Sequence, residues 1–287
     1  MNEGRYRASH DDRRREGHEV IEWARRAEAA GFSGLGTIDR LVYDNYESLM
    51  ALGAAAAVTE RIGLITSIAI LPYRVNAALV AKQAATVQKL SGGRLILGVA
   101  PGGRPDDYEA GGVPFDNRGR RFEQMLDDMK RIWAGEERGT AGAIGPDVSD
   151  DPPTLVLGGQ IDAAFRRAAQ YGAGWISGGG PPEYFPPAIE KLEAAWHDAG
   201  RDGEPRKLSL TYFSLDDDPE SQVRKTIGDY YAFAGDYREM VVTGAAKGED
   251  AVKERVRAYE EVGCDELVMF PASSNPEQVD RLAAAVL

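Results

Sequence analysis

Regular alternation between strand-like and helix-like segments constrains the fold of this chain more than any other feature of its sequence. Short apolar or β-branched runs are separated by longer segments whose apolar residues recur every three or four positions. Several of the longer segments end at a glycine, as helices commonly do. The short runs show little polar alternation, which is typical of strands covered on both faces. Seven strands are expected, at residues 33–38, 62–70, 94–99, 154–158, 174–178, 207–215 and 264–270.

This alternation predicts an α/β fold in which helices surround one parallel sheet. An eight-fold barrel needs a further strand before the first helical segment, and the opening residues, MNEGRYRASH, show no strand pattern. Strand one is therefore either lost or truncated, or an irregular segment takes its place. Residues 134–153, rich in Gly, Asp and Pro, are expected to form a long loop within the domain. We expect residues 1–287 to form a single domain.

Charge and hydropathy exclude several classes of partner. The formal net charge of −12 argues against binding to nucleic acid or to an anionic membrane surface. The longest apolar run, Ile62 to Leu71, is far shorter than the ~20 residues that a membrane-spanning helix needs. A single cysteine, Cys264, excludes an internal disulfide. Together these features predict a soluble protein of the cytoplasm.

Several common signatures of nucleotide binding, metal binding and nucleophilic catalysis are missing from the sequence. The segment GVAPGG does not have the glycine spacing of a dinucleotide-binding fingerprint, and neither a P-loop nor a nucleophile elbow is present. The three histidines lack the spacing of zinc ligands, so no metal site is expected. In DDDPE, Asp218 and Pro219 are interpreted as the cap and first residue of a helix. The protein therefore either takes its chemistry from a cofactor or performs none.

Pairs of glycines follow three consecutive predicted strands. The carboxyl ends of parallel strands form the edge at which α/β proteins bind ligands. One glycine pair is unremarkable in a turn, but three neighbouring pairs favour a surface at which backbone approaches a flat or phosphorylated ligand. The second pair precedes a helix that carries Arg166 and Arg167, an arrangement that suits a phosphate group. The three pairs are Gly102–Gly103, Gly158–Gly159 and Gly178–Gly179.

The sequence from about residue 18 onward resembles the luciferase-like flavin-dependent oxidoreductases. The resemblance is carried by AKQAATVQKLSGGRLILGVAPGGRPDDYEAGGVPFDNRGRRFEQMLDDMKRIWAGE and by WARRAEAAGFSGLGTIDRL, TLVLGGQIDAAFRRAAQYGAGWIS and VKERVRAYEEVGCDELVMFPASSNPEQVDRL. It implies a luciferase-like (β/α)8 TIM barrel that binds FMN, or alternatively the deazaflavin coenzyme F420, at the carboxyl end of its strands. It also implies a non-prolyl cis peptide behind the ring system, at Ser67–Ile68.

The same resemblance implies which residues form the site. Asp39 and Arg40 would face the ring or the substrate, and Tyr108 would lie beside the pocket as a further catalytic candidate, although it could equally anchor its loop. Gly158, Gly159 and Gln160 would hold the phosphate. The remaining expected cofactor contacts are Thr66, Ser67, Ile68, Ala100, Gly102, Gly103, Trp175, Gly178 and Gly179.

One departure from the family pattern concerns proton delivery. Several deazaflavin-dependent members carry a Glu just past strand four, where this chain has Gly103. The ionisable candidates that remain are Arg40, Tyr43, Asp107 and Tyr108, and the sequence does not rank them.

The leading hypothesis for the function is an FMN-using monooxygenase that acts on a small organic substrate, with electrons supplied by a flavin reductase. The alternatives are hydride transfer with F420 and a flavin-binding protein without catalysis. A homodimer is expected from the resemblance.

Overall fold

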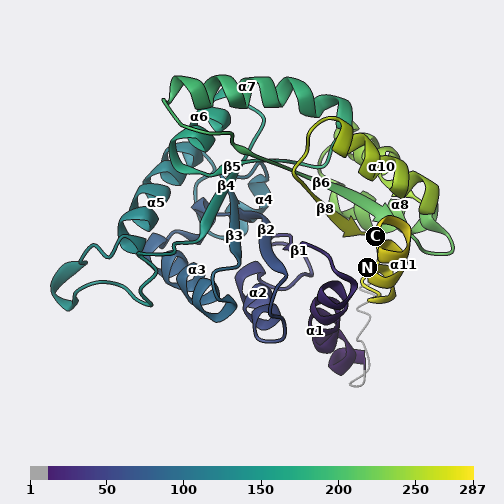
Figure 1. Ribbon diagram of the computed structural model, residues 1–287, viewed down its shortest axis with the longest axis horizontal. Coiled ribbons are helices and arrows are strands. Elements are labelled where there is room, and N and C mark those ends of the chain that lie inside the picture. Colours follow the sequence, from purple (N-terminus) through teal and green to yellow (C-terminus); the bar gives the residue numbers. More distant parts are fainter. Residues whose placement is uncertain (1–11) are drawn as a thin grey trace, which may run out of the picture.

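The computed structural model of the chain describes residues 12–287 and shows a parallel sheet surrounded by helices (Figure 1). All seven predicted strands are present, each within two residues of its expected ends. An eighth strand, β7, is only two residues long and pairs with the end of β6. The strands are β1 (Gly34–Thr37), β2 (Gly63–Ile70), β3 (Leu95–Ala100), β4 (Thr154–Gly158), β5 (Gly174–Ser177), β6 (Arg206–Ser214), β7 (Ala246–Lys247) and β8 (Glu266–Pro271).

Helices separate the strands and pack on the outside of the sheet (Figure 1). The α/β prediction is thus confirmed, and residues 219–244 add two helices between β6 and β7. The helices are α1 (Asp12–Ala30), α2 (Ser48–Ala56), α3 (Ala77–Ser91), α4 (Pro105–Ala110), α5 (Arg118–Trp133), α6 (Asp162–Tyr171), α7 (Phe185–Asp198), α8 (Pro219–Tyr230), α9 (Asp236–Gly244), α10 (Glu249–Glu261) and α11 (Glu277–Val286).

Local sequence signals account for several helix ends. The Asp218 carboxylate accepts a hydrogen bond from Ser221 N at the start of α8, and Pro219 is the first residue of that helix, as predicted. Asn76 caps α3 in the same manner, and α3 ends at Gly92, whose φ of 66° favours glycine. Residues 134–153 form the predicted loop, which projects from the body and contains an antiparallel bridge between Glu137 and Ala143 (Figure 1).

The sheet is open on one side. Neighbouring strands pair in the order β1 to β6, and β8 then pairs with β6, but within residues 12–287 no hydrogen-bonded ladder joins β8 to β1. Helix α1 leads into β1, so the part of the chain that the structure describes contains no strand ahead of α1. The sequence-based expectation for strand one falls on residues 1–11, which lie outside the described residues, and it stays a prediction.

Two glycines of β1 let β8 come close at this open side. A Cβ atom on Gly36 would lie 2.5 Å from Val268 Cγ1, and one on Gly34 would lie 2.6 Å from Glu266 Oε1. Side chains of β8 therefore enter the barrel interior past β1, and the wall is completed there by side-chain contact.

The core has two layers. The larger layer lies between the sheet and the helices, and the inner one fills the barrel with side chains such as Ile65, Tyr212 and Val268. Apolar residues of α8 and α9 join the inner cluster, so these two helices cap the barrel interior beyond β6. None of the described helices is long and apolar enough to cross a membrane.

Candidate active site

The Ser67–Ile68 peptide bond is cis, as the resemblance implied. It lies near the carboxyl end of β2, where the pairing register between β2 and β3 shifts between Thr66 and Ala69. The Ser67 hydroxyl is buried and has no hydrogen-bond partner, so it is available to a ligand. The neighbouring Thr66 hydroxyl instead donates to Gly98 O over 2.7 Å and supports the strand.

The structure brings the predicted cofactor residues of β2, β3 and β4 together around this bond. A Cβ atom on Gly158 would lie 2.2 Å from Ile68 Cδ1 and 3.7 Å from Ala100 Cβ, so glycine is required for this close approach. By contrast, a Cβ atom on Gly103 or on Gly178 would meet nothing within 4 Å. The surface is tightly packed where Gly158 meets Ile68, whereas Gly103 and Gly178 face open space.

The predicted phosphate site lies at the start of α6. Gly159 has a φ of 129°, and its carbonyl oxygen accepts a hydrogen bond of 2.8 Å from the Trp175 indole. Trp175 is fully buried, so its hydrogen bond supports this turn from within the fold. Gln160 follows at the surface. The backbone N–H groups that begin α6 are suited to an anion.

The two arginines of α6 do not join this site. Arg167 pairs with Glu123 over 2.6 Å. Arg166 lines a groove on the outer surface between α6 and α7. The sequence-based suggestion that they assist a phosphate is therefore not supported by their positions.

Asp39 is buried and holds its surroundings in place. Its carboxylate accepts hydrogen bonds of 2.8 Å from Ile70 N, from the Tyr73 hydroxyl and from Arg74 Nη2. Burial and the Asp39 charge raise the pKa of Tyr73 well above its ordinary value. Asp39 thus joins the end of β1 to the end of β2. Its carboxylate already has three partners, and its catalytic role stays a prediction.

Arg40 forms a buried ion pair with the loop after β3. Its Nε donates to Asp107 Oδ2 over 2.7 Å, and its Nη2 lies 3.1 Å from Asp106 Oδ2. The guanidinium group also lies over the rings of Tyr43 and Tyr230, 5.9 and 5.3 Å from their centroids. Its Nη1 is buried without a partner, so Arg40 keeps one donor for a ligand.

Tyr108 is positioned to anchor its loop. The ring is buried against Tyr73 and Phe115, and the hydroxyl donates to the carbonyl oxygen of Pro101. Burial raises the pKa of Tyr108 to about 12. Of the two roles that the sequence left open, this geometry favours loop anchoring, because a hydroxyl already bound to a carbonyl is a poor proton donor.

Sequence reasoning missed a group of aromatic residues from α8, α9 and the turn between them. Arg104 Cζ lies 3.4 Å from the centroid of the Phe233 ring, and Arg104 Nη1 donates to Tyr230 O. The hydroxyl of Tyr237 donates to Gly179 O over 3.0 Å. We call Tyr230, Tyr231, Phe233 and Tyr237 the aromatic cap. The density of aromatic residues in DYYAFAGDY was the available signal.

Comparison with protein families supports what the geometry suggests. The model of the luciferase-like monooxygenases matches residues 4–285. The chain belongs to this family. Relatives include an uncharacterized protein of Mycobacterium tuberculosis, 32% identical over 227 residues, which cover 68% of this chain and 78% of the relative. An FMNH(2)-dependent dimethylsulfone monooxygenase of Pseudomonas putida is 27% identical and shares 67% of this chain and 54% of its own length. Members of this family thus include enzymes.

Solved structures confirm the fold of this luciferase-like chain. An F420-dependent secondary alcohol dehydrogenase, in complex with an F420–acetone adduct, superposes with a TM-score of 0.75 at 19% identity and covers 93% of both chains. A monooxygenase from Streptomyces bottropensis has the same TM-score at 21% identity, with 93% of this chain and 90% of its own covered. These likenesses establish the barrel architecture, and the first of the two proteins is F420-dependent.

Proposed function

We propose that this luciferase-like protein is an FMN-dependent monooxygenase that acts on a small organic molecule. The observation that carries the proposal is the close-packed surface of Ile68, Ala100 and Gly158, with open space beside Gly103 and Gly178. Asp39, Asp106 and Asp107 are all bound to arginines at this edge. A site whose carboxylates are already paired suits a reaction in which the cofactor does most of the chemistry.

The residues present fit a bound flavin. The unpaired Ser67 hydroxyl and the backbone beside Gly103 would contact the ring system, and Gly158, Gly159 and the start of α6 would hold the phosphate. Reduced FMN, when bound, supplies electrons for the activation of oxygen. The aromatic cap would keep water from that site, and Arg40 Nη1 would orient the substrate. Under this proposal a separate flavin reductase delivers the reduced cofactor, and the protein forms a homodimer.

F420-dependent hydride transfer is the alternative, and the glycine at position 103 disfavours it. The Glu that several deazaflavin-dependent relatives carry at this place would have to be replaced by another acid. Two of the four candidates for that acid are engaged, since Asp107 is paired with Arg40 and the Tyr108 hydroxyl is bound to Pro101 O.

Titration of the purified protein with oxidised FMN and with F420, followed by difference absorbance, tests the proposal. Gly103→Leu and Gly178→Leu should each weaken FMN binding by about tenfold or more, because a side chain would occupy the space beside the ring. Ala134→Leu is the control, since Ala134 is exposed at the end of α5, at the start of the projecting loop. The proposal is wrong if the parent protein takes up neither cofactor, and F420 is preferred if it alone binds.

Oxygen dependence separates the two chemistries. With NADH and an added flavin reductase, an FMN monooxygenase should consume oxygen in proportion to product. Turnover that continues under nitrogen with reduced or oxidised F420 would instead establish hydride transfer. Cofactor binding without either activity, over a broad panel of substrates, would favour a non-catalytic flavoprotein.

A further inference from the structure

Two tyrosine hydroxyls are hydrogen-bonded to each other near the carboxyl end of the barrel strands. The Tyr212 hydroxyl of β6 and the Tyr231 hydroxyl of the aromatic cap are 2.8 Å apart, and either can be the donor. We call Tyr212 and Tyr231 the tyrosine pair. Tyr212 is only 7% exposed, and its ring meets the Tyr231 ring edge to face, with 5.9 Å between the centroids. The pair therefore joins the aromatic cap to the barrel interior.

The tyrosine pair has one hydroxyl hydrogen more than its own hydrogen bond uses. Each phenol carries one hydrogen, and the bond between the two oxygens needs only one of them. Within residues 12–287 neither hydroxyl makes another hydrogen bond, so no described residue accepts the second hydrogen. Burial raises the pKa of both tyrosines well above the ordinary value, and both stay protonated at neutral pH. The pair thus keeps a free donor, which a bound acceptor would satisfy.

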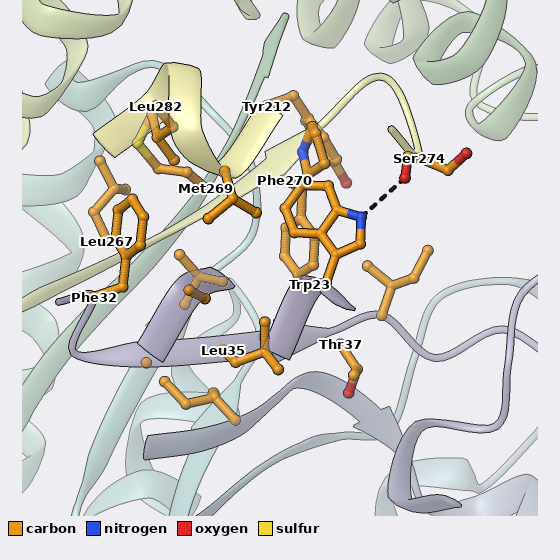
Figure 2. A pocket seen from close by; sticks show the side chains of 18 of the residues that line it. Trp23, Phe32, Leu35, Thr37, Tyr212, Leu267, Met269, Phe270, Ser274 and Leu282 are labelled. Atoms are coloured by element: carbon orange, nitrogen blue, oxygen red, sulfur yellow. Dashed lines mark hydrogen bonds between the residues drawn. The ribbon is translucent and has the colours of Figure 1, made fainter. Parts of the chain in front are cut away.

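Tyr212 belongs to a layer of side chains in the barrel interior that also contains Ser67. Tyr212 and Phe270 of β8 are paired in register, and their ring centroids lie 6.2 Å apart (Figure 2). A Cβ atom on Gly36 would lie 3.4 Å from Phe270 Cζ and 3.6 Å from Ser67 Oγ. Phe270 thus separates the tyrosine pair from Ser67, and both groups hold an unused hydroxyl hydrogen.

The tyrosine pair also borders the proposed cofactor contacts. A Cβ atom on Gly179 would lie 3.0 Å from Tyr212 Cε2, whereas one on Gly178 would meet nothing within 4 Å. The close-packed surface proposed for the flavin is built from β2, β3 and β4, and Tyr212 stands on β6, two places beyond β4 in the sheet. A molecule bound over the flavin would therefore meet the tyrosine pair on its other side.

We propose that Tyr212 donates the free hydrogen of the pair to an uncharged acceptor oxygen, such as a carbonyl or ether oxygen, of the molecule on which the enzyme acts. Tyr231 is a positioning residue that donates its own hydrogen to the Tyr212 oxygen. That the ligand is the substrate rests on the proposed function. The donor itself rests on the hydroxyl pair and on its place in the layer with Ser67. The four ionisable candidates named from the sequence do not include it.

Two probes of the same shape isolate this hydrogen bond. Acetophenone has a carbonyl oxygen where α-methylstyrene has a methylene group, and each is titrated into the full chain by calorimetry, with and without saturating FMN. Tyr212→Phe should weaken binding of acetophenone about fivefold, the equivalent of one hydrogen bond of about 1 kcal/mol. Binding of α-methylstyrene should change by less than about twofold, because the phenyl ring of residue 212 is retained.

Two further variants separate the roles of the two tyrosines. Tyr231→Phe leaves Tyr212 with its hydrogen, so acetophenone binding should weaken by no more than about twofold. Tyr171→Phe is the matched control, because Tyr171 is half-buried at the end of α6 and packs on the outer core, and neither probe should bind differently to it.

The carbonyl band of the bound probe reports the hydrogen bond directly. In infrared difference spectra of isotope-labelled acetophenone, the C=O band should lie at lower wavenumber in the parent protein than in Tyr212→Phe. Tyr171→Phe should match the parent. A purely structural role of Tyr212 would not move this band.

Each outcome decides between the proposals. Absence of acetophenone binding to the parent, equal weakening of both probes in Tyr212→Phe, or a larger loss in Tyr231→Phe than in Tyr212→Phe would overturn the tyrosine-pair proposal. A carbonyl band that is unchanged in Tyr212→Phe would do the same. Because one series contains no cofactor, the expected changes in a protein that takes up neither FMN nor F420 would contradict the proposed function alone. FMN binding without any effect of Tyr212→Phe would contradict the tyrosine-pair proposal alone.

Discussion

Arg40 Nε and Asp107 Oδ2 are 2.7 Å apart, and each of the two side chains is only 3% exposed. The second Asp107 oxygen accepts hydrogen bonds from the backbone nitrogens of Leu41 and Val42, over 3.0 and 2.8 Å. One carboxylate therefore fastens the loop after β1 to the helix that follows β3. The two loops that border the candidate site on this side are thus held as one unit.

Removal of this carboxylate should be strongly destabilising. We expect Asp107→Ala to lower the free energy of unfolding by about 3–5 kcal/mol, because the Arg40 charge stays buried and unpaired. Urea denaturation measures the change. Glu136→Ala, which removes the exposed partner of Arg131, is the control and should leave the midpoint unchanged. A loss in Asp107→Ala no larger than in this control would show that the pair is not buried in solution.

Replacement of Ser67 separates ligand binding from stability. Its hydroxyl is buried without a partner, so Ser67→Ala should keep or slightly raise the thermal midpoint. FMN binding should weaken about fivefold, the equivalent of one lost hydrogen bond of about 1 kcal/mol. Ser209→Ala, at a fully buried serine of β6, should leave FMN binding unchanged. An unaltered dissociation constant in Ser67→Ala would remove Ser67 from the cofactor site.

Stability should fall at high pH because of buried tyrosines. Burial raises the pKa of Tyr108 to about 12 in the folded protein, whereas an unfolded tyrosine ionises near pH 10. Its contribution is therefore full below pH 10 and is lost as the pH rises from about 10 to about 12. Unfolding free energies measured in steps from pH 8 to 11 should show this decline. Tyr108→Phe should decline less steeply, and an identical slope would contradict the assignment.

Ionisation of Glu266 should destabilise the folded protein, whereas ionisation of most carboxylates stabilises it. Burial raises its pKa, against the opposing effects of Arg206 and Ser33. The folded state thus binds the Glu266 proton more tightly than the unfolded state does. The stabilisation that this provides is full below pH ~4.5 and is lost as the pH rises through the raised pKa. We expect Glu266→Gln to be more stable than the parent at pH 8, with a difference that shrinks toward pH 4.

Thermal midpoints across this pH range provide the test of the Glu266 assignment. The control is Glu204→Gln, because the Glu204 side chain is 87% exposed and its substitution should show no such pH-dependent difference. A Glu266→Gln variant that is less stable than the parent at pH 8 would show that the Arg206 ion pair outweighs burial.

The strands were predictable because their signals are local. Apolar runs such as those of β2 and β3 and the glycines that follow them lie within short windows, and the family motifs add the cis bond at Ser67–Ile68. The roles of polar residues at strand ends were harder to read. Asp39 looks like a catalytic residue in sequence, yet its partners Ile70, Tyr73 and Arg74 lie 31 to 35 positions away.

The aromatic cap and the contact of β8 with β1 could not be read from sequence. Arg104 meets the backbone of Tyr230 across 126 residues, and no periodic pattern encodes such a contact. How closely β8 approaches β1 is a property of the whole barrel. The opening residues show no strand pattern in the sequence, but the contacts of β8 with Gly34 and Gly36 required the structure.

Among the described residues, β8 meets β1 at Gly34 and Gly36 through side chains and without a hydrogen-bonded ladder. Along every other strand boundary from β1 to β6, sliding by one residue would break a parallel ladder and turn side chains to the wrong face. In the described part of the chain, sliding of β8 along β1 would break no ladder. The boundary between β8 and β1 is therefore held by side-chain packing, and the fit of Val268 against Gly36 sets how the two strands lie.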